Sequence, residues 1–200
     1  MEITSRALFL FAVLDPIEKN KTHNNIKDKD FSGIVNKNIL SRAKKIKLVI
    51  TDVDGVLTDG GMYYSSKGDV MKKFHVRDGM GVTLLRKAGI PTIIITKEQT
   101  PMVRQWAKRM KIKKLFDGIV QKEKMLQSVC NMFKVKESEV AYIGDDINDV
   151  NLLKMVGFAA APKDAIPLVK NNSDYVCGKN GGEGALREIA EIILLAKAKS

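Results

Sequence analysis

The stretch Ile46–Asp59, IKLVITDVDGVLTD, decides the fold class of the chain. Its first half, Ile46–Thr51, is rich in β-branched residues and predicts a buried strand. The strand runs directly into Asp52, Asp54 and Gly55, an Asp-x-Asp-Gly spacing that ends in a turn. Side chains two residues apart on a strand point to the same side, so both carboxylates are expected together at the end of this strand.

Further along the chain, short apolar segments alternate with segments of helical periodicity. Strands that are apolar throughout and alternate with helices are typical of a parallel sheet covered on both faces. We therefore predict an α/β protein with a Rossmann-like, doubly wound and mainly parallel sheet. The other expected strands are Pro91–Thr96, Leu115–Val120, Val140–Gly144, Phe158–Ala161 and Tyr175–Cys177. The expected helices are Gly79–Ala88, Pro101–Met110, Glu123–Phe133, Asn148–Val156 and Glu183–Lys199.

One segment interrupts this alternation. Asp59–Asp78 carries two short runs around a Ser-Ser-Lys-Gly sequence, which predicts a β-hairpin. An insertion here lies over the carboxyl end of the sheet, where open α/β folds bind ligands. We expect residues 45–200 to form one domain and residues 1–44 to form an N-terminal extension that is partly disordered. The apolar run Ala7–Leu14 is expected to dock on the body or on another subunit, with a cleaved targeting segment as the alternative.

Composition narrows the classes of function. The net charge is +11, from 34 Lys and Arg against 23 Asp and Glu. The lysines are scattered along the chain without a basic helix or an aromatic-basic stripe, so nucleic-acid binding is not expected. No apolar run approaches the ~18 residues needed to cross a bilayer, so no membrane span is expected. Two cysteines cannot form a disulfide framework, which favours a reducing, cytoplasmic setting.

A second acidic cluster follows the expected strand Val140–Gly144. The carboxyl ends of parallel strands meet at one edge of the sheet, so four or five carboxylates are expected to converge. Like charges this close stay ionised together only when a cation neutralises them, and oxygen-only ligands select a hard ion such as Mg²⁺. A single Asp would more simply be a cap or turn residue, but two clusters favour a metal site. The second cluster consists of Asp145, Asp146 and Asp149.

This edge is suited to phosphoryl transfer. A metal-bound aspartate can attack phosphorus, and a second carboxyl two residues further can protonate the leaving oxygen and then deprotonate water. The phosphoryl group also needs hydrogen-bonding and cationic support. Thr96 offers a hydroxyl at the same edge, and Lys124 offers an ammonium group. Lys122 is the nearby alternative to Lys124.

Together these residues resemble the motifs of the haloacid dehalogenase superfamily of phosphatases. Asp52–Gly60 (DVDGVLTDG) is similar to the first motif, and Gly144–Asp149 (GDDIND) is similar to the fourth. Thr96 falls at the second motif and Lys124 at the third. All four occur in the family's order.

The resemblance implies a role for each residue. Asp52 would be the nucleophile and Asp54 the acid/base. Mg²⁺ would be held by Asp52, the backbone carbonyl of Asp54 and Asp145. The remaining roles would be phosphoryl binding by Thr96 and Lys124, and support of the metal and of Lys124 by Asp146 and Asp149.

A subgroup is also indicated, because the space between the first two motifs has no room for a large cap domain. The hairpin, the segment 72–81 (KKFHVRDGMG) and the segment 181–188 (GGEGALRE) are similar to the capless phosphatases of phosphorylated 3-deoxy-2-keto sugar acids. The resemblance implies a homotetramer whose hairpins pack together. It also implies that the C-terminal segment around Glu183 covers the site of a neighbouring subunit.

The nature of the sugar acid is read from a few positions. Lys97 and Glu98 stand where enzymes acting on 3-deoxy-D-manno-octulosonate 8-phosphate typically have Gly-Arg, and Glu183 stands where they more often have a basic residue. These departures favour a nine-carbon nonulosonate 9-phosphate (KDN or N-acylneuraminate), with the eight-carbon substrate as the alternative. Arg77 is the first candidate for binding the substrate carboxylate.

Two questions stay open at this point. Lys72, Lys73 and His75 of the hairpin segment are further candidates for the substrate carboxylate, although both lysines also fit a solvated face. A non-catalytic tetramerisation module is the alternative class of function, and the presence of Asp52 and Asp54 argues against it.

Overall fold

The computed structural model describes residues 35–198, so the apolar run Ala7–Leu14 lies outside the described residues. The strands of the main sheet are β1 (Leu48–Thr51), β4 (Thr92–Ile95), β5 (Lys114–Phe116), β6 (Val140–Ile143), β7 (Phe158–Ala161) and β8 (Tyr175–Val176). They lie in the order β5-β4-β1-β6-β7-β8, and every neighbouring pair is parallel. The predicted doubly wound parallel sheet is confirmed, with β1 at its centre.

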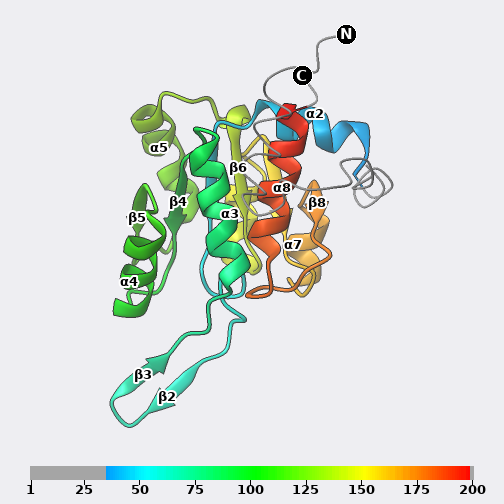
Figure 1. Ribbon diagram of the computed structural model, residues 1–200. Helices are drawn as coiled ribbons and strands as arrows, with labels where there is room; N and C mark the ends of the chain where they lie inside the picture. Colours follow the sequence, from blue (N-terminus) through cyan, green and yellow to red (C-terminus); the bar gives the residue numbers. More distant parts are fainter. Residues whose placement is uncertain (1–34, 199–200) are drawn as a thin grey trace, which may run out of the picture.

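Helices cover both faces of this sheet (Figure 1). The α-helices are α2 (Lys37–Lys45), α3 (Val76–Lys87), α4 (Pro101–Met110), α5 (Leu126–Phe133), α6 (Val150–Leu153), α7 (Pro167–Asn171) and α8 (Ala185–Ala198). Three short 3₁₀ turns are η1 (Lys122–Met125), η2 (Glu137–Glu139) and η3 (Ile147–Asp149). Buried residues of α2, α3, α4 and α8 belong to one core cluster, and those of α5, α6 and α7 belong to another.

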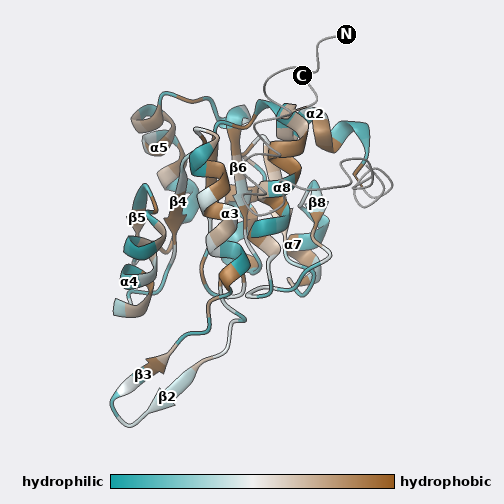
Figure 2. Cartoon of the chain, in the orientation of Figure 1, coloured by the Kyte–Doolittle hydropathy of each residue, from teal (hydrophilic) through white to brown (hydrophobic). Residues whose placement is uncertain are grey.

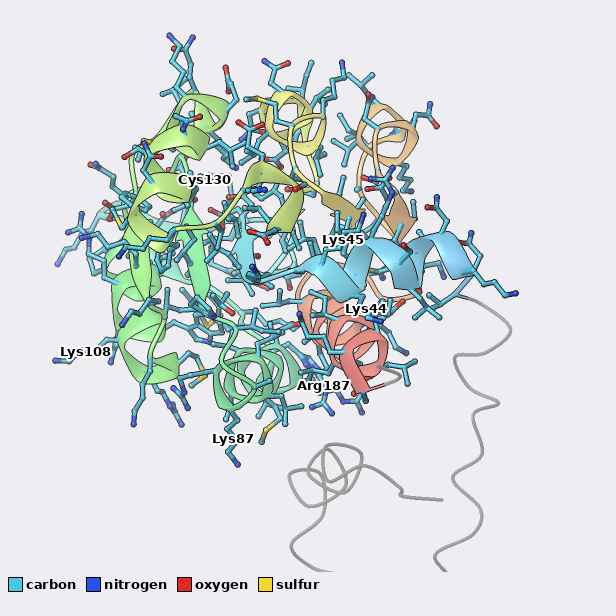
Figure 3. All side chains as sticks on the ribbon, turned by 90° about the horizontal axis from the view of Figure 1, so that it is seen from above. Lys44, Lys45, Lys87, Lys108, Cys130 and Arg187 are labelled. Atoms are coloured by element: carbon cyan, nitrogen blue, oxygen red, sulfur yellow. The ribbon has the colours of Figure 1, made fainter. Side chains whose placement is uncertain are left out.

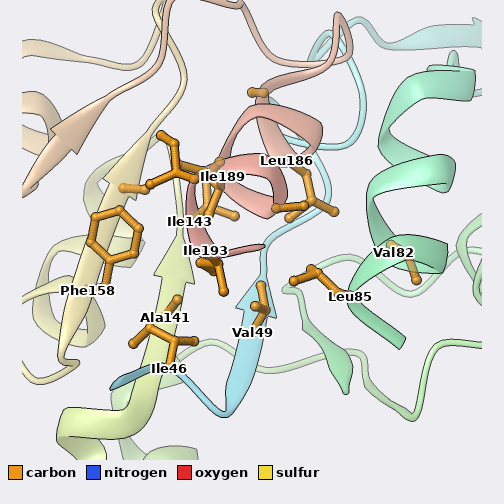
Figure 4. Close-up of a cluster of buried hydrophobic side chains, with 14 of the residues drawn as sticks. Ile46, Val49, Val82, Leu85, Ala141, Ile143, Phe158, Leu186, Ile189 and Ile193 are labelled. Carbon is orange, nitrogen blue, oxygen red and sulfur yellow. The ribbon is translucent and has the colours of Figure 1, made fainter. Parts of the chain in front are cut away.

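The alternation of β1 explains why there are two clusters. Val49 points into the first cluster, beneath α3 and α8, whereas Leu48 and Ile50 point into the second. Figure 4 shows Val49 with Leu85 of α3 and Ile193 of α8. Because both faces are buried, nearly every strand residue is apolar, as the sequence pattern predicts.

The predicted hairpin is confirmed. Strands β2 (Tyr63–Ser65) and β3 (Gly68–Met71) pair antiparallel and extend away from the body at the carboxyl edge of the sheet (Figure 1). No cap domain is inserted between β1 and β4, where the chain forms only this hairpin and α3. The segment between β1 and β4 therefore supplies only the hairpin, and no larger domain, at the carboxyl edge of the sheet.

The start of the folded body differs from the prediction. Helix α2 begins at Lys37, inside the residues 1–44 that were expected to form a partly disordered extension, and its Ile39 and Ala43 are buried against α8 and the sheet. Asn36 caps the helix by accepting a hydrogen bond from the Ile39 amide at 3.0 Å. A lysine-rich, single-stripe helix carries too few apolar residues to be recognised from its pattern alone.

The surface lysines are dispersed. Lys44 and Lys45 of α2, Lys87 of α3 and Lys108 of α4 are all exposed, and Figure 3 shows Lys87 and Lys108 pointing away from the body. Within residues 35–198, no helix is both long enough and apolar enough to cross a bilayer.

Asp78 joins α3 to the start of α8. Its buried carboxylate accepts hydrogen bonds from the backbone amides of Gly184, at 3.2 Å, and Arg187, at 3.0 Å. Burial raises the pKa of Asp78 to about 6, and the hydrogen bond from the Arg187 amide opposes that rise. These amides are the free donors at a helix N-terminus, so Asp78 supplies their acceptors from another element.

The loop before α8 is also tied to the loop after β1. The Gly182 amide donates to the Val56 carbonyl at 2.9 Å. Gly181 lies so close to the Gly55 carbonyl that a Cβ atom at position 181 would collide with it. A glycine is required at position 181 because two backbones meet there without space for a side chain.

We predict that Asp78→Ala lowers the free energy of unfolding by about 2–3 kcal/mol, because two buried amides lose their acceptor. Urea unfolding followed by circular dichroism measures this change. Glu191→Ala is the control, since it removes a partly exposed ion pair with Arg187 on the same helix and should cost less than about 1 kcal/mol. Equal losses in the two variants would contradict the anchoring role of Asp78.

Candidate active site

The ends of three neighbouring strands bring polar residues together. Asp52 follows β1, Thr96 follows β4 and Asp145 lies just beyond β6. One carboxylate oxygen each from Asp52, Asp145 and Asp149 lies within 4.8 Å of the others. Thr96 is buried at the same edge, next to β1 in the strand order. The topology thus brings together three of the four or five carboxylates that were expected to converge.

Lys122 is the cation inside this cluster. Its side chain is fully buried, and its Nζ atom lies 2.7 Å from Asp52 Oδ2 and 2.6 Å from Asp149 Oδ1. Burial alone would lower the pKa of Lys122, but the two carboxylates outweigh burial and the net direction is upward. Lys122 therefore carries a positive charge directly beside Asp52.

The expectation for Lys124 is corrected by this geometry. Lys124 is exposed, and in the described part of the chain the ion pairs to Asp52 and Asp149 both come from Lys122. Both lysines lie in η1, which has about three residues per turn, so residues two apart point to different sides. The helix was expected to begin at Glu123, whereas η1 already begins at Lys122.

Asp149 connects several parts of the cluster through hydrogen bonds to both of its carboxylate oxygens. Its Oδ1 atom accepts hydrogen bonds from Lys122 and from the Tyr142 hydroxyl, the latter at 2.5 Å. Its Oδ2 atom accepts from the backbone amides of Asp145, at 2.8 Å, and Asp146, at 3.2 Å. Protein donors thus occupy both oxygens of Asp149. They link Lys122 to the loop that carries Asp145.

Two further residues differ from expectation. Tyr142 was not predicted as a site residue, because it stands within an apolar strand and reads as core. Asp146 is exposed, and its Oδ1 atom accepts a hydrogen bond from the Ile147 amide at 2.7 Å, so its visible contact is that of a cap. The sequence does not show that the Tyr142 hydroxyl contacts Asp149, because this contact depends on how η3 folds back on β6.

The carboxylates of the cluster disfavour one another's negative charge. Burial raises the pKa of Asp52 to about 7, with Lys122 opposing the shift and Asp149 adding to it. Burial, followed by the charges of Asp52 and Asp149, raises the pKa of Asp145 to about 8. Both shifts mean that negative charge on Asp52 and Asp145 is costly even beside Lys122, and that a further cation at the site would relieve this cost.

The donor atoms fit a hard divalent cation. Asp52 Oδ1 and Asp145 Oδ1 are buried and have no hydrogen-bond partner within residues 35–198. Gly55 has a φ of 81°, and a Cβ atom there would collide with the Asp145 carboxylate. The glycine therefore leaves room for a carboxylate beside the loop after β1. Two orphaned carboxylate oxygens without a sulfur or imidazole ligand suit Mg²⁺.

Asp54 lies beside this cluster, and its two oxygens differ. Its Oδ1 atom is 2.6 Å from Lys72 Nζ and also accepts a hydrogen bond from the Thr58 hydroxyl at 3.3 Å. Its Oδ2 atom is buried and lacks a partner among the described residues. Lys72, one of the open candidates of the hairpin segment, thus contacts the carboxylate expected to act as acid/base.

The other expected substrate-binding residues form two separate groups. Lys73 pairs with Asp59 at 3.2 Å, at the base of the hairpin. Lys97 and Glu98 are exposed beyond Thr96.

Arg77 and Glu183 lie elsewhere, along a pocket of about 700 Å³ whose lining includes Lys179, Arg187 and Glu188. Arg77 packs alongside Gly184, on the outer side of the loop before α8. Glu183 is exposed. Within one chain, the structure therefore does not bring Arg77 and Glu183 to the carboxylate cluster.

A buried lysine among carboxylates, at the carboxyl edge of a doubly wound sheet, defines a metal-dependent site for phosphoryl transfer. The comparisons with known proteins agree. Residues 94–189 match the family model of haloacid dehalogenase-like hydrolases. The chain is 40% identical over 159 residues to the 3-deoxy-D-manno-octulosonate 8-phosphate phosphatase of Haemophilus influenzae, covering 80% of this chain and 88% of that protein. The chain belongs to the haloacid dehalogenase-like hydrolases, in the capless group that contains these phosphatases.

Solved structures extend the likeness to the fold. The Yersinia pestis 3-deoxy-D-manno-octulosonate 8-phosphate phosphatase superimposes with a TM-score of 0.80 at 36% identity, covering 82% of this chain and 89% of that one. The Moraxella catarrhalis phosphatase, in complex with magnesium, phosphate and KDO, gives a TM-score of 0.78 at 37% identity, covering 81% and 94%. The protein is thus a phosphoric monoester hydrolase. Mg²⁺, the cofactor of such phosphatases, matches the acidic cluster found here.

We predict that Lys122→Met lowers kcat by about 100-fold or more, because the site loses the fully buried positive charge beside Asp52. Lys124→Met should stay within about twofold of wild type. Initial rates on p-nitrophenyl phosphate with Mg²⁺ measure both, and thermal unfolding verifies that each variant is folded. A larger loss in Lys124→Met would restore the original assignment.

Proposed function

We propose that this protein hydrolyses 3-deoxy-D-manno-octulosonate 8-phosphate to the free sugar acid and inorganic phosphate, with Mg²⁺ as cofactor. The observation that carries the proposal is the 40% identity, over 80% of the chain, to a phosphatase of that substrate. The cluster of Asp52, Asp145 and Lys122 supplies the chemistry that this reaction needs.

The comparisons favour the eight-carbon substrate over the nine-carbon one that the sequence favours. The departures behind the nine-carbon hypothesis are Lys97, Glu98 and Glu183, and all three side chains are exposed. Lys97 and Glu98 follow Thr96 on the exposed side, and Glu183 lies apart from the carboxylate cluster. None of the three belongs to the reacting centre.

We infer that Asp52 is the nucleophile. Its carboxylate oxygen forms a bond to phosphorus while the ester P–O bond breaks, and the bonding electrons go to the sugar oxygen. Asp54 donates the proton that this oxygen needs on leaving. Asp54 then takes a proton from water, which attacks the aspartyl-phosphate and releases inorganic phosphate and Asp52.

The remaining residues hold the phosphoryl group and the metal. Lys122 and the Thr96 hydroxyl lie where they can neutralise and hydrogen-bond the phosphoryl oxygens. Asp52, the backbone carbonyl of Asp54 and Asp145 would hold Mg²⁺, with Asp149 orienting Lys122 from behind. When bound, Mg²⁺ offsets the negative charge that the carboxylates and the phosphate bring together.

Steady-state kinetics on matched substrates test this proposal. We expect kcat/KM to be at least about tenfold higher for 3-deoxy-D-manno-octulosonate 8-phosphate than for KDN 9-phosphate or N-acetylneuraminate 9-phosphate. Activity on all three should disappear with EDTA and return with Mg²⁺. A higher kcat/KM for either nine-carbon ester would instead support the nonulosonate hypothesis.

We further propose that the chain works as a homotetramer assembled through its hairpins. Met62, Tyr64, Val70 and Met71 are 68%, 62%, 57% and 53% exposed. Figure 2 shows the apolar colour of β3 on a hairpin that stands clear of the body. An isolated two-stranded hairpin is marginally stable, and exposed apolar patches mark association surfaces.

We expect Val70→Asp to shift the protein from tetramer to smaller species, because it places a charge on this apolar surface. Light scattering coupled to size-exclusion chromatography measures the change. Lys67→Glu, at the exposed tip of the same hairpin, is the control and should leave the assembly intact. A monomeric wild-type protein, or a tetrameric Val70→Asp variant, would rule out assembly through this surface.

We place the reaction in the cytoplasm. Cys130 and Cys177 are both buried as free thiols. Burial raises the pKa of each thiol, which keeps both in the unreactive protonated form. Unpaired thiols are the normal state of cysteine in a reducing compartment.

A further inference from the structure

The hairpin rejoins the body through two lysines that contact the loop after β1. Lys72 Nζ lies 2.6 Å from Asp54, and Lys73 Nζ lies 3.2 Å from Asp59. The two pairs differ in environment, because the Lys72 side chain is 7% exposed whereas that of Lys73 is 52% exposed. An exposed pair contributes little, but a largely buried pair fixes the geometry of both partners.

The backbone around Lys72 is held in place. Phe74 forms an antiparallel bridge with Thr58, directly joining the hairpin base to the loop after β1. The Phe74 ring stacks on Trp106 of α4, with centroids 4.9 Å apart and an interplanar angle of 12°. Lys72 therefore reaches Asp54 from a fixed position, two residues before this anchored ring.

The contacts of Asp54 are asymmetric in a way that matters for chemistry. Oδ1 receives both Lys72 and the Thr58 hydroxyl. Oδ2 is buried and has no partner within residues 35–198. The two contacts to Oδ1 restrict rotation of the Asp54 carboxyl group. They therefore fix the direction in which Oδ2 points.

We propose that Lys72 is a positioning residue that holds Asp54 by Oδ1, so that Oδ2 faces the leaving-group oxygen of the ester. This inference rests on the proposed function, in which Asp54 is the acid/base. It gives the hairpin a second use besides association, because its base carries the residue that orients the proton donor.

The inference predicts a dependence on the leaving group. An alkyl ester releases an alkoxide, which needs the proton from Asp54 as the bond breaks. A p-nitrophenyl ester releases a stabilised phenolate, which leaves without help from an acid. Misplacing Asp54 therefore slows formation of the aspartyl-phosphate far more for alkyl esters than for the aryl ester. The ratio kcat/KM reports this step without the later attack of water, in which Asp54 serves every ester alike. Losing phosphoryl binding or the fold would lower kcat/KM for both kinds of ester.

The test compares Lys72→Met with wild type on glycerol 1-phosphate, 3-deoxy-D-manno-octulosonate 8-phosphate and p-nitrophenyl phosphate. We expect kcat/KM on the two alkyl esters to fall by about 100-fold, because proton transfer to the leaving oxygen contributes on that scale. The kcat/KM on p-nitrophenyl phosphate should fall by less than about fivefold. Lys72→Gln, which keeps a hydrogen-bond donor, should give an intermediate loss on the alkyl esters.

The control is Lys67→Met, which removes an exposed lysine of the same hairpin and should leave all three rates unchanged. Thermal unfolding and light scattering verify the fold and the assembly of each variant. Equal loss on alkyl and aryl esters, or no loss on either, would overturn the role of Lys72. Wild-type protein that hydrolyses glycerol 1-phosphate but not the sugar-acid phosphate would contradict the proposed substrate alone.

Discussion

A fully buried ammonium group is the constraint on which this site depends. An unpaired charge in the interior costs several kcal/mol, and Lys122 avoids that cost only through Asp52 and Asp149. Asp149 is held in turn by the Tyr142 hydroxyl and by the amides that follow β6. Three segments distant in sequence are thereby fixed to one another by charge as well as by packing. The same pairing presents Asp52 to the site with one oxygen bound and the other without a partner.

Much of the fold could be predicted from local patterns. Helix α4 and strand β7 begin and end at the predicted residues, because Pro101 fixes a helix start and an apolar run bounded by glycine and proline marks a strand. Helix α2 could not be predicted in this way, because its stability comes from packing on α8 rather than from a distinctive sequence. Helix α7 is only five residues long and was also absent from the prediction.

The site was predictable to the extent that topology determines it. Parallel strands place their ends together, so Asp52 and Asp145 could be located from strand ends alone. Lys122 could not be chosen over Lys124, because residues two apart face different sides of a turn and the sequence does not show which side faces the carboxylates. The contact of Lys72 with Asp54 spans a hairpin whose exit angle is set by tertiary packing, which no local pattern encodes.

The close approach of Gly181 to Gly55 has a consequence for the order of events during synthesis. The loop that carries Asp54 is buttressed by a segment near the end of the chain, and Asp78 binds Gly184 across 106 positions. A nascent polypeptide therefore contains every candidate catalytic side chain well before it contains the backbone that supports them. Such non-local contacts form late, after most of the domain has emerged from the ribosome. A nascent chain that has not yet reached Gly184 lacks the backbone contacts that hold the loop of Asp54 in place.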